Sequence, residues 1–203
     1  MKIADNVYSL DSTRGCSAYI IKGSETVMID TGFPGIKKSV LRELESMKIN
    51  PGDIKHILLT HHDIDHIGLV SVLQELTGAR VWASREDIPY ITGALKRHGI
   101  KGYLPGKAIP PENITAYEAG QKIGGIEVIP TPGHTPGHVC LLYKDILFAG
   151  DLLLSQRSKL RLLPGFITWS RSQLQQSLQR IAEVPFQWIC PSHGRPEKRS
   201  GVW

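Results

Sequence analysis

Short apolar runs closed by glycine, proline or histidine alternate with amphipathic stretches along this chain. Runs of this length and composition are typical of β-strands. They predict strands over residues 17–23, 26–32, 55–60 and 79–84, and later over 114–123, 126–131, 138–144, 146–151 and 186–191.

Between these runs, apolar residues recur with helical spacing. They predict helices over about 36–47, 67–78 and 86–97, and a last helix that starts at Ser170. Gln173 completes a capping box with Ser170, and Trp169 faces Leu174 as a hydrophobic staple. Two sheets covered by helices satisfy this alternation. No composition break marks a linker, so we expect a single domain over residues 1–203.

Composition adds few constraints. Hydrophobic residues make up 41% and charged residues 21%, which is ordinary for a soluble protein. No run approaches the ~18 apolar residues of a membrane span, and no apolar segment of a secretory signal opens the chain. The three cysteines, Cys16, Cys140 and Cys190, are odd in number and lie outside any CxxC motif. We therefore expect buried, inert thiols and a cytoplasmic protein without membrane contact.

Positive charge is concentrated in two segments. Residues 95–107 and 152–172 contain no acid and together carry +8, so the remainder carries −3 of the net +5. Their cations are Lys96, Arg97, Lys101, Lys107, Arg157, Lys159, Arg161 and Arg171. This pattern favours either two solvated loops or an anionic partner. We expect a small, anionic substrate rather than nucleic acid, and the sequence defines no oligomeric state.

Histidines and aspartates stand where several apolar runs end. His61, Asp63, Asp65 and His66 follow residues 55–60, while single donors follow later runs at His134, Asp151 and His193. A lone histidine at such a place is more often a hydrogen-bonded loop residue, but the joint pattern indicates a metal site. Imidazole suits zinc, iron and copper, whereas carboxylate shifts the preference toward harder ions. We expect His62 to point away from this site and His138 to lie beside it.

The segments "THHDIDH", "TPGHTPGH", "FAGD" and "PSHG" resemble the metallo-β-lactamase-fold hydrolase superfamily. Its hallmark is H-x-H-x-D-H followed by a single His, Asp and His, and the resemblance extends to "VMIDTG" near the start. It implies an α+β fold, a four-layer αββα sandwich, with two divalent metal ions, foremost zinc. The first metal would be held by His61, residue 63 and His134, and the second by Asp65, His66 and His193. Asp151 would bridge both metals, and Asp30 would steady the metal loops.

Asp63 departs from the family pattern, which has histidine at this position. In one interpretation Asp63 ligates and the site is dinuclear, with iron or manganese tolerated beside zinc. In a second it does not ligate, and one metal remains at the second site. In a third the site is degenerate. The flavodiiron proteins resemble the first case, because they carry a carboxylate here and use iron, but no flavin site is visible in this chain.

The bridging Asp151 argues against a true β-lactamase. Large nucleases of the family need an inserted domain, and 203 residues leave no room for it. Only 10 residues follow His193, so we expect no glutathione-binding helical domain of the glyoxalase II type. The resemblance therefore implies hydrolysis of an ester-like bond, in a lactone, thioester or ester, by metal-bound hydroxide. Lactonase and glyoxalase II-like thioesterase are the nearest classes.

In this interpretation Asp65 and Asp151 orient the water, and Arg157, Lys159 and Arg161 bind a substrate anion. Candidate walls of the pocket are Tyr103, Phe33, Phe166 and Trp169. Three alternatives stay open: a phosphodiesterase, an iron-dependent oxidoreductase and a non-catalytic metal-binding module.

Overall fold

The computed structural model describes residues 1–102, 108–118 and 120–199, which form two sheets packed face to face. The first sheet holds, in spatial order, β1 (Lys2–Ala4), β2 (Val7–Ser9), β3 (Tyr19–Ile21), β4 (Thr26–Ile29), β5 (Ile54–Leu58), β6 (Arg80–Ala83) and β7 (Ile114–Ala116). The second holds β15 (Glu197–Lys198), β14 (Trp188–Pro191), β11 (Ile146–Gly150), β10 (Val139–Tyr143), β9 (Ile126–Pro130) and β8 (Lys122–Ile123). A separate hairpin is formed by β12 (Leu154–Gln156) and β13 (Lys159–Arg161).

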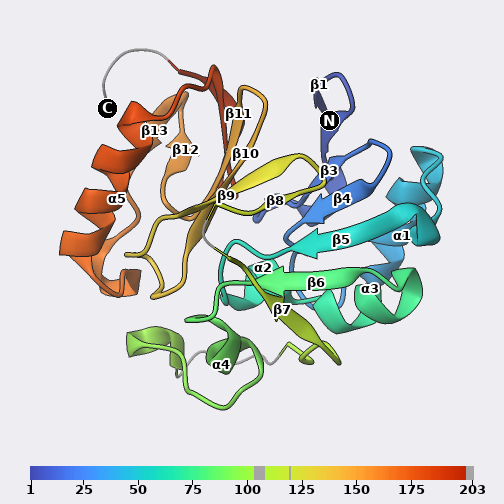
Figure 1. Cartoon of the computed structure of the whole chain (residues 1–203), viewed down its shortest axis with the longest axis horizontal. Helices are drawn as coiled ribbons and strands as arrows, with labels where there is room; N and C mark the ends of the chain where they lie inside the picture. Colours follow the sequence, from blue (N-terminus) through green and yellow to red (C-terminus); the bar gives the residue numbers. More distant parts are fainter. Residues whose placement is uncertain (103–107, 119, 200–203) are drawn as a thin grey trace.

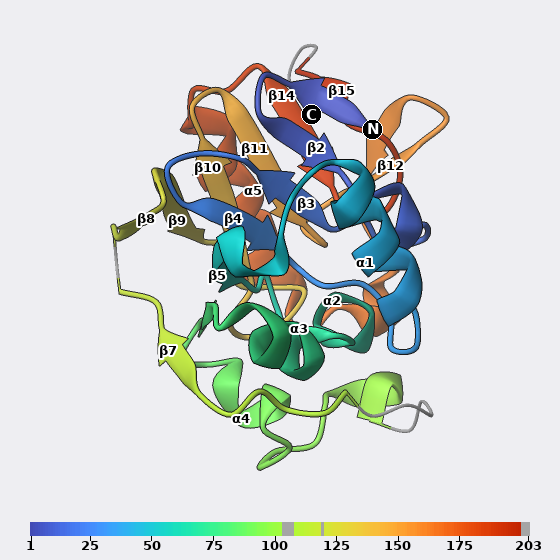
Figure 2. The same cartoon turned by 90° about the vertical axis from the view of Figure 1, so that its right-hand side faces the viewer.

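Helices cover the outer face of each sheet (Figure 1). The helices are α1 (Lys37–Ser46), α2 (Ile64–Ile67), α3 (Val70–Thr77), α4 (Ile88–Ile91) and α5 (Arg171–Glu183). Short 3₁₀ turns are η1 (Asp11–Thr13), η2 (Pro51–Asp53), η3 (Gly99–Gly102) and η4 (Gly165–Ile167). Helices α1 and α3 lie on the side of the first sheet and α5 on the side of the second, as the turned view also shows (Figure 2). None of the described helices is long and apolar enough to cross a membrane.

Three apolar layers hold the sandwich together, and strand alternation explains them. Along β3, Ile20 packs toward α1 with Val40 and Leu44, whereas Tyr19 packs between the sheets against Phe148. A third layer lies between the second sheet and α5 and includes Leu147, Ile189, Leu174 and Ile181. This arrangement confirms the predicted four-layer αββα sandwich.

Two of the predicted elements are wrong in extent. The helix predicted over 86–97 is limited to α4, because Gly93 takes φ +78° and ends it. The strand predicted over 114–123 is in fact two strands, β7 and β8, which belong to different sheets; Gly120, at φ +70°, lies between them. The last helix does begin after Ser170, whose side chain accepts a hydrogen bond from Gln173 N.

The carboxyl ends of two parallel strand pairs meet where the sheets adjoin. Strands β4 and β5 are parallel in the first sheet, and β11 and β14 are parallel in the second. Hydrogen bonds from Val139 N to Thr60 O (2.9 Å) and from Ser17 N to Ser192 O (2.7 Å) join the sheets there. Tyr19 Oη adds a third, to Pro191 O (2.6 Å). The loops that leave these four strands are therefore held against one another.

Candidate metal centre

All seven predicted metal ligands lie at this junction. His61 and Asp63 follow β5, and Asp65 and His66 lie on the single turn of α2. His134 follows β9, Asp151 directly follows β11, and His193 follows β14. The first sheet thus supplies four of the donors and the second sheet three, and the structure gathers them into two groups.

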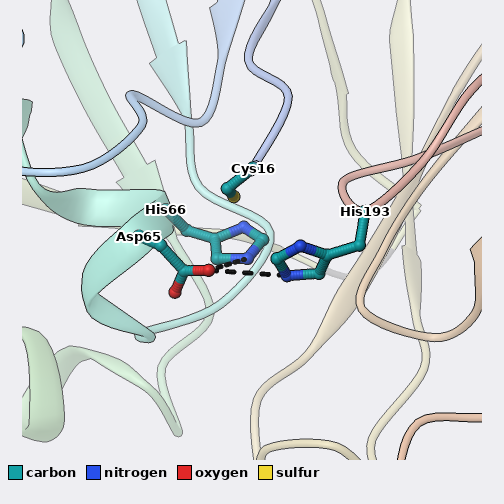
Figure 3. A group of neighbouring side chains, drawn as sticks. All are labelled: Cys16, Asp65, His66 and His193. Carbon is teal, nitrogen blue, oxygen red and sulfur yellow. Dashed lines mark ion pairs between the residues drawn. The ribbon is translucent and has the colours of Figure 1, made fainter. Parts of the chain in front are cut away.

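The second group, named after the second metal ion of the family pattern, contains Asp65, His66 and His193, whose side chains point toward one another (Figure 3). Asp65 Oδ2 lies 3.8 Å from His66 Nε2 and 3.4 Å from His193 Nε2. Ligand atoms at 2.0–2.1 Å from a tetrahedral zinc ion would lie about 3.3 Å from each other. The spacing therefore matches a coordination shell better than it matches hydrogen bonds.

The first group, named after the first metal ion of the family pattern, contains His61, Asp63, His134 and Asp151. Asp63 Oδ2 lies 3.6 Å from His61 Nε2 and 3.1 Å from His134 Nε2. Asp63 therefore directs a carboxylate oxygen toward the same point as its two histidines, where the family pattern has an imidazole.

Asp151 lies between the two groups and turns one oxygen to each. Its Oδ2 is 3.4 Å from His134 Nε2 and 3.9 Å from His61 Nε2. Its Oδ1 is 3.4 Å from both His66 Nε2 and His193 Nε2. This is the geometry that a carboxylate shared by two cation sites requires.

Unpartnered atoms show that these residues fit a cation. Among the described residues, several buried side-chain atoms at this place have no hydrogen-bond partner, namely His61 Nε2, Asp63 Oδ1, His66 Nε2, His134 Nδ1 and Asp151 Oδ1. An unsatisfied buried polar group costs about 1–3 kcal/mol, more when it is charged. A divalent ion would remove that cost for the three of these atoms that face the other donors, namely His61 Nε2, His66 Nε2 and Asp151 Oδ1.

The hydrogen bonds of the outer histidine nitrogens also fit a cation site. His66 Nδ1 lies 2.8 Å from Asp30 Oδ2, His61 Nδ1 lies 3.0 Å from Thr60 Oγ1, and His193 Nδ1 lies 2.5 Å from Gly15 O. Each outer nitrogen thus has an acceptor for its proton, which leaves the Nε2 lone pair free to face the centre. Carboxylate–histidine pairs of the Asp30–His66 kind orient metal ligands in many proteins.

Mutual charge keeps the carboxylates ionised. Burial raises the pKa of Asp151, but the neighbouring imidazoles of His66 and His193 outweigh it and hold this pKa well below the usual value. Burial likewise lowers the pKa of His193, but the neighbouring carboxylates of Asp151 and Asp65 outweigh it and raise this pKa to about 10. A metal ion would take the place of such protons, because it binds the deprotonated ligands.

Two further residues brace the loops. His138 Nε2 accepts the backbone N–H of Asp151 (3.1 Å), and burial lowers the pKa of His138 to about 3, so its ring stays neutral. Asp87 is fully buried and accepts hydrogen bonds from His62 N, Thr135 Oγ1 and Gly137 N. Its Oδ2 also lies 2.9 Å from His62 Nδ1, which turns His62 away from the donors. Asp87 was not predicted, since nothing in its surrounding sequence marks it.

A cavity of about 260 Å³ opens beside the first group. Phe166 and Trp169, two of the four predicted walls, line it, but Phe33 is not among its lining residues. Tyr103 and Lys107 lie outside the described residues.

The predicted anion-binding residues Arg157, Lys159 and Arg161 stand on the exposed β12–β13 hairpin and do not line this cavity. The hairpin is anchored beside the second group, by Ser155 N on His193 O (2.8 Å).

Two residues of the centre were not predicted as part of it. Lys101 belongs to the basic segment 95–107, yet it is only 7% exposed and its Nζ lies 2.5 Å from Asp63 Oδ2. Cys16 lies beside His66 and Asp65 in the second group (Figure 3), and burial raises the pKa of its thiol to about 12. Both come from segments with no metal-binding motif, so only the fold brings them here.

Comparisons with known proteins agree with this architecture. The family described as the metallo-beta-lactamase superfamily matches residues 12–193. A probable metallo-hydrolase of Methanocaldococcus jannaschii, MJ0888, is 28% identical over 183 residues, which are 88% of this chain and 87% of that protein. A hydroxyacylglutathione hydrolase of Shewanella baltica is 34% identical over 152 residues, or 75% of this chain and 51% of that protein.

The fold is shared with solved structures as well. A B3 metallo-beta-lactamase with an active-site glutamic acid superimposes with a TM-score of 0.75 at 24% identity, covering 97% of this chain and 81% of the other. With the family match spanning most of the sequence and the donors gathered at one junction, the chain belongs to the metallo-beta-lactamase superfamily.

Proposed function

We propose that this protein is a metal-dependent hydrolase that cleaves an ester-like bond, in a thioester, lactone or ester, of a small anionic molecule. The observation that supports it most is Asp151, whose two oxygens face two groups of buried nitrogen and oxygen donors. Divalent zinc fits the imidazole-rich donors, and iron or manganese fits the additional carboxylate of Asp63. A cation held there by these residues would lower the pKa of a water from 15.7 to about 7 and so supply a nucleophile at neutral pH.

Residues of the chain orient the attacking water and accommodate the substrate in this proposal. Asp65 and Asp151 are ionised acceptors beside the donor nitrogens, so they orient the attacking water through its protons. The cavity beside His134, Phe166 and Trp169 has room for a small acyl group. The hairpin cations Arg157, Lys159 and Arg161 are exposed near His193 and would attract an anionic substrate from solution.

The hydroxyacylglutathione hydrolase among the relatives supports the thioester class, although this chain spans about half of that protein's length. A cytoplasmic location is part of the proposal, since Cys16, Cys140 and Cys190 are free, buried thiols. We propose no membrane or nucleic-acid partner.

A substrate panel tests the proposal. The zinc-loaded protein is given a hydroxyacyl glutathione thioester, an N-acyl homoserine lactone, an aryl acetate and a bis-aryl phosphodiester. We expect turnover of at least one of the first three, and a fall in kcat/KM of about 10²-fold or more in Asp65→Asn, from loss of water orientation. The exposed Glu75→Gln is the matched control.

Turnover of the phosphodiester alone would contradict the ester-like class. Metal binding without turnover of any substrate would instead favour a binding module, and dioxygen consumption by an iron-loaded protein would favour an oxidoreductase.

A further inference from the structure

Lys101 is a lysine inside a cluster of metal-type donors. It lies on η3, and its side chain reaches into the first group, where it is almost fully buried. Its Nζ donates to Asp63 Oδ2 at 2.5 Å and lies 2.9 Å from His134 Nε2. These are the atoms that would bind the first metal ion, so the ammonium uses the lone pairs that the ion needs.

The ammonium and a metal ion compete for this place. An ion bound to Asp63 Oδ2 at 2.0–2.2 Å would lie within about 4.6 Å of a Nζ that is 2.5 Å from the same oxygen. Two cations this close repel strongly away from water, because the effective dielectric constant of a buried site is low. The ion can bind only if Lys101 withdraws, which would leave a buried ammonium without its acceptors.

Asp63 explains why the ammonium is tolerated. A histidine here would be neutral, whereas Asp63 adds a negative charge beside that of Asp151. The Lys101 Nζ lies 2.5 Å from Asp63 Oδ2, and both side chains are almost fully buried. Asp63 and Lys101 therefore form a buried, charge-matched pair inside the centre.

The second group is different in composition. There the carboxylate oxygens of Asp65 and Asp151 face the imidazoles of His66 and His193 at 3.4–3.8 Å. That spacing leaves room for an ion among the four residues, whereas in the first group Lys101 Nζ already contacts Asp63 Oδ2 and His134 Nε2.

We propose that the Lys101 ammonium takes the place of the first metal ion, so that this chain binds one divalent ion, at Asp65, His66, His193 and Asp151. Lys101 then supplies the second positive charge of the centre as a tethered side chain. It also lines the 260 Å³ cavity with His134, so this charge faces the space available to a substrate. The inference rests on the proposed function only in that the second group must bind metal.

Metal stoichiometry tests this directly. Wild-type protein, Lys101→Met and the exposed-lysine control Lys96→Met are stripped with a chelator, reloaded with zinc and desalted, and the zinc per chain is measured by elemental analysis. We expect one zinc in the wild type and in Lys96→Met, and two in Lys101→Met. Circular dichroism verifies that each variant is folded, and Lys101→Gln, which keeps a neutral donor to Asp63, replaces Lys101→Met if the latter does not fold.

Cobalt titration followed by visible absorption provides a second readout. The wild type should saturate after one equivalent, and the Lys101 variant after two. Two tightly held ions in the wild type, with no change on removing Lys101, would overturn the role of Lys101 but leave the proposed function intact. Absence of bound metal from every variant would overturn both.

Discussion

Asp30 has a strained backbone, and the hydrogen bonds of its side chain offset the energetic cost of that strain. It adopts φ +54°, a left-handed conformation that costs a non-glycine residue roughly 1–2 kcal/mol. Its carboxylate accepts hydrogen bonds from Thr60 N (2.8 Å) and Thr60 Oγ1 (2.7 Å) and faces His66 Nδ1. The turn after β4 is therefore held in the conformation that orients the His66 imidazole.

Replacing Asp30 by asparagine should weaken metal binding at the second group. The amide keeps the shape but loses the charge that fixes the His66 tautomer, so we expect a drop in zinc affinity of about 10–100-fold. Competition with a chromophoric chelator measures it, with the exposed Asp5→Asn as control. Unchanged zinc affinity in Asp30→Asn would refute the orienting role.

The three cysteines should resist modification in the folded protein. All three are buried, and burial raises the pKa of Cys16 and Cys140 to about 12. Since the thiolate is the reactive form, a thiol reagent such as dithionitrobenzoate should titrate no cysteine at pH 7.5 until denaturant is added. Rapid reaction of one thiol in the native protein would show that its segment opens locally.

Single residues also mark the limit of sequence reasoning. His61, Asp65 and His66 were found because they form a contiguous motif at the end of a strand, and the structure does bring them together. Lys101 was assigned only to a basic loop, and Asp87 was not noticed. Each contacts partners about 25–50 positions away in the chain, so no local pattern carries the information.

At the level of elements, α2 is positioned by close backbone contact. A Cβ atom on Gly68 would lie 2.3 Å from Pro34 N and 2.5 Å from Gly32 O. Gly68 N also donates to Gly32 O (3.0 Å), and Thr31 N to His66 O (2.7 Å). The turn that carries Asp65 and His66 is therefore pressed against the loop after β4.

Substituting Gly68 by alanine should destabilise the protein, because backbone rather than a flexible side chain must move. We expect a loss of about 1–3 kcal/mol in the free energy of unfolding, measured by urea denaturation. Gly52→Ala is a suitable control, because a Cβ there meets nothing within 4 Å, and its effect should stay within about 0.5 kcal/mol. Equal stability of the two variants would argue against tight packing at Gly68.

Elements with a strong apolar run were predictable, and those defined by pairing were not. Strands β4, β5, β10 and β11 each consist of an apolar run whose burial is enough to predict the strand. Residues 114–123 appear as one strand in sequence, yet β7 and β8 pair in different sheets. Short edge strands such as β1 and β15 owe their conformation to a neighbouring strand, so their own two or three residues contain no such signal.

On the scale of the whole molecule, the proposed metal centre would link the two sheets. Asp65 and His66 come from the first sheet and His193 from the second, so an ion bound by all three would hold the sheets together. Ligands that bind only the folded state raise its stability by RT ln(1 + [L]/Kd), about 4 kcal/mol at a thousandfold excess over Kd.

Chelation should therefore lower the melting temperature by several degrees, and zinc should restore it. Calorimetry of the wild type and His193→Ala, each with and without zinc, measures the effect. The variant should lose most of the zinc-dependent shift, because it lacks the ligand from the second sheet. An equal shift in both proteins would place the stabilising ion elsewhere.

The meeting of two parallel strand pairs has a further consequence for how such a chain diverges. The apolar layers that determine whether it folds lie along the strands, while the residues that determine what it acts on lie in the loops beyond one edge. Mutation can therefore lengthen, recharge or reshape those loops with little effect on folding. Asp63 and Lys101 both lie in such segments, outside all three apolar layers, so their pairing places no demand on the packing that holds the sheets together.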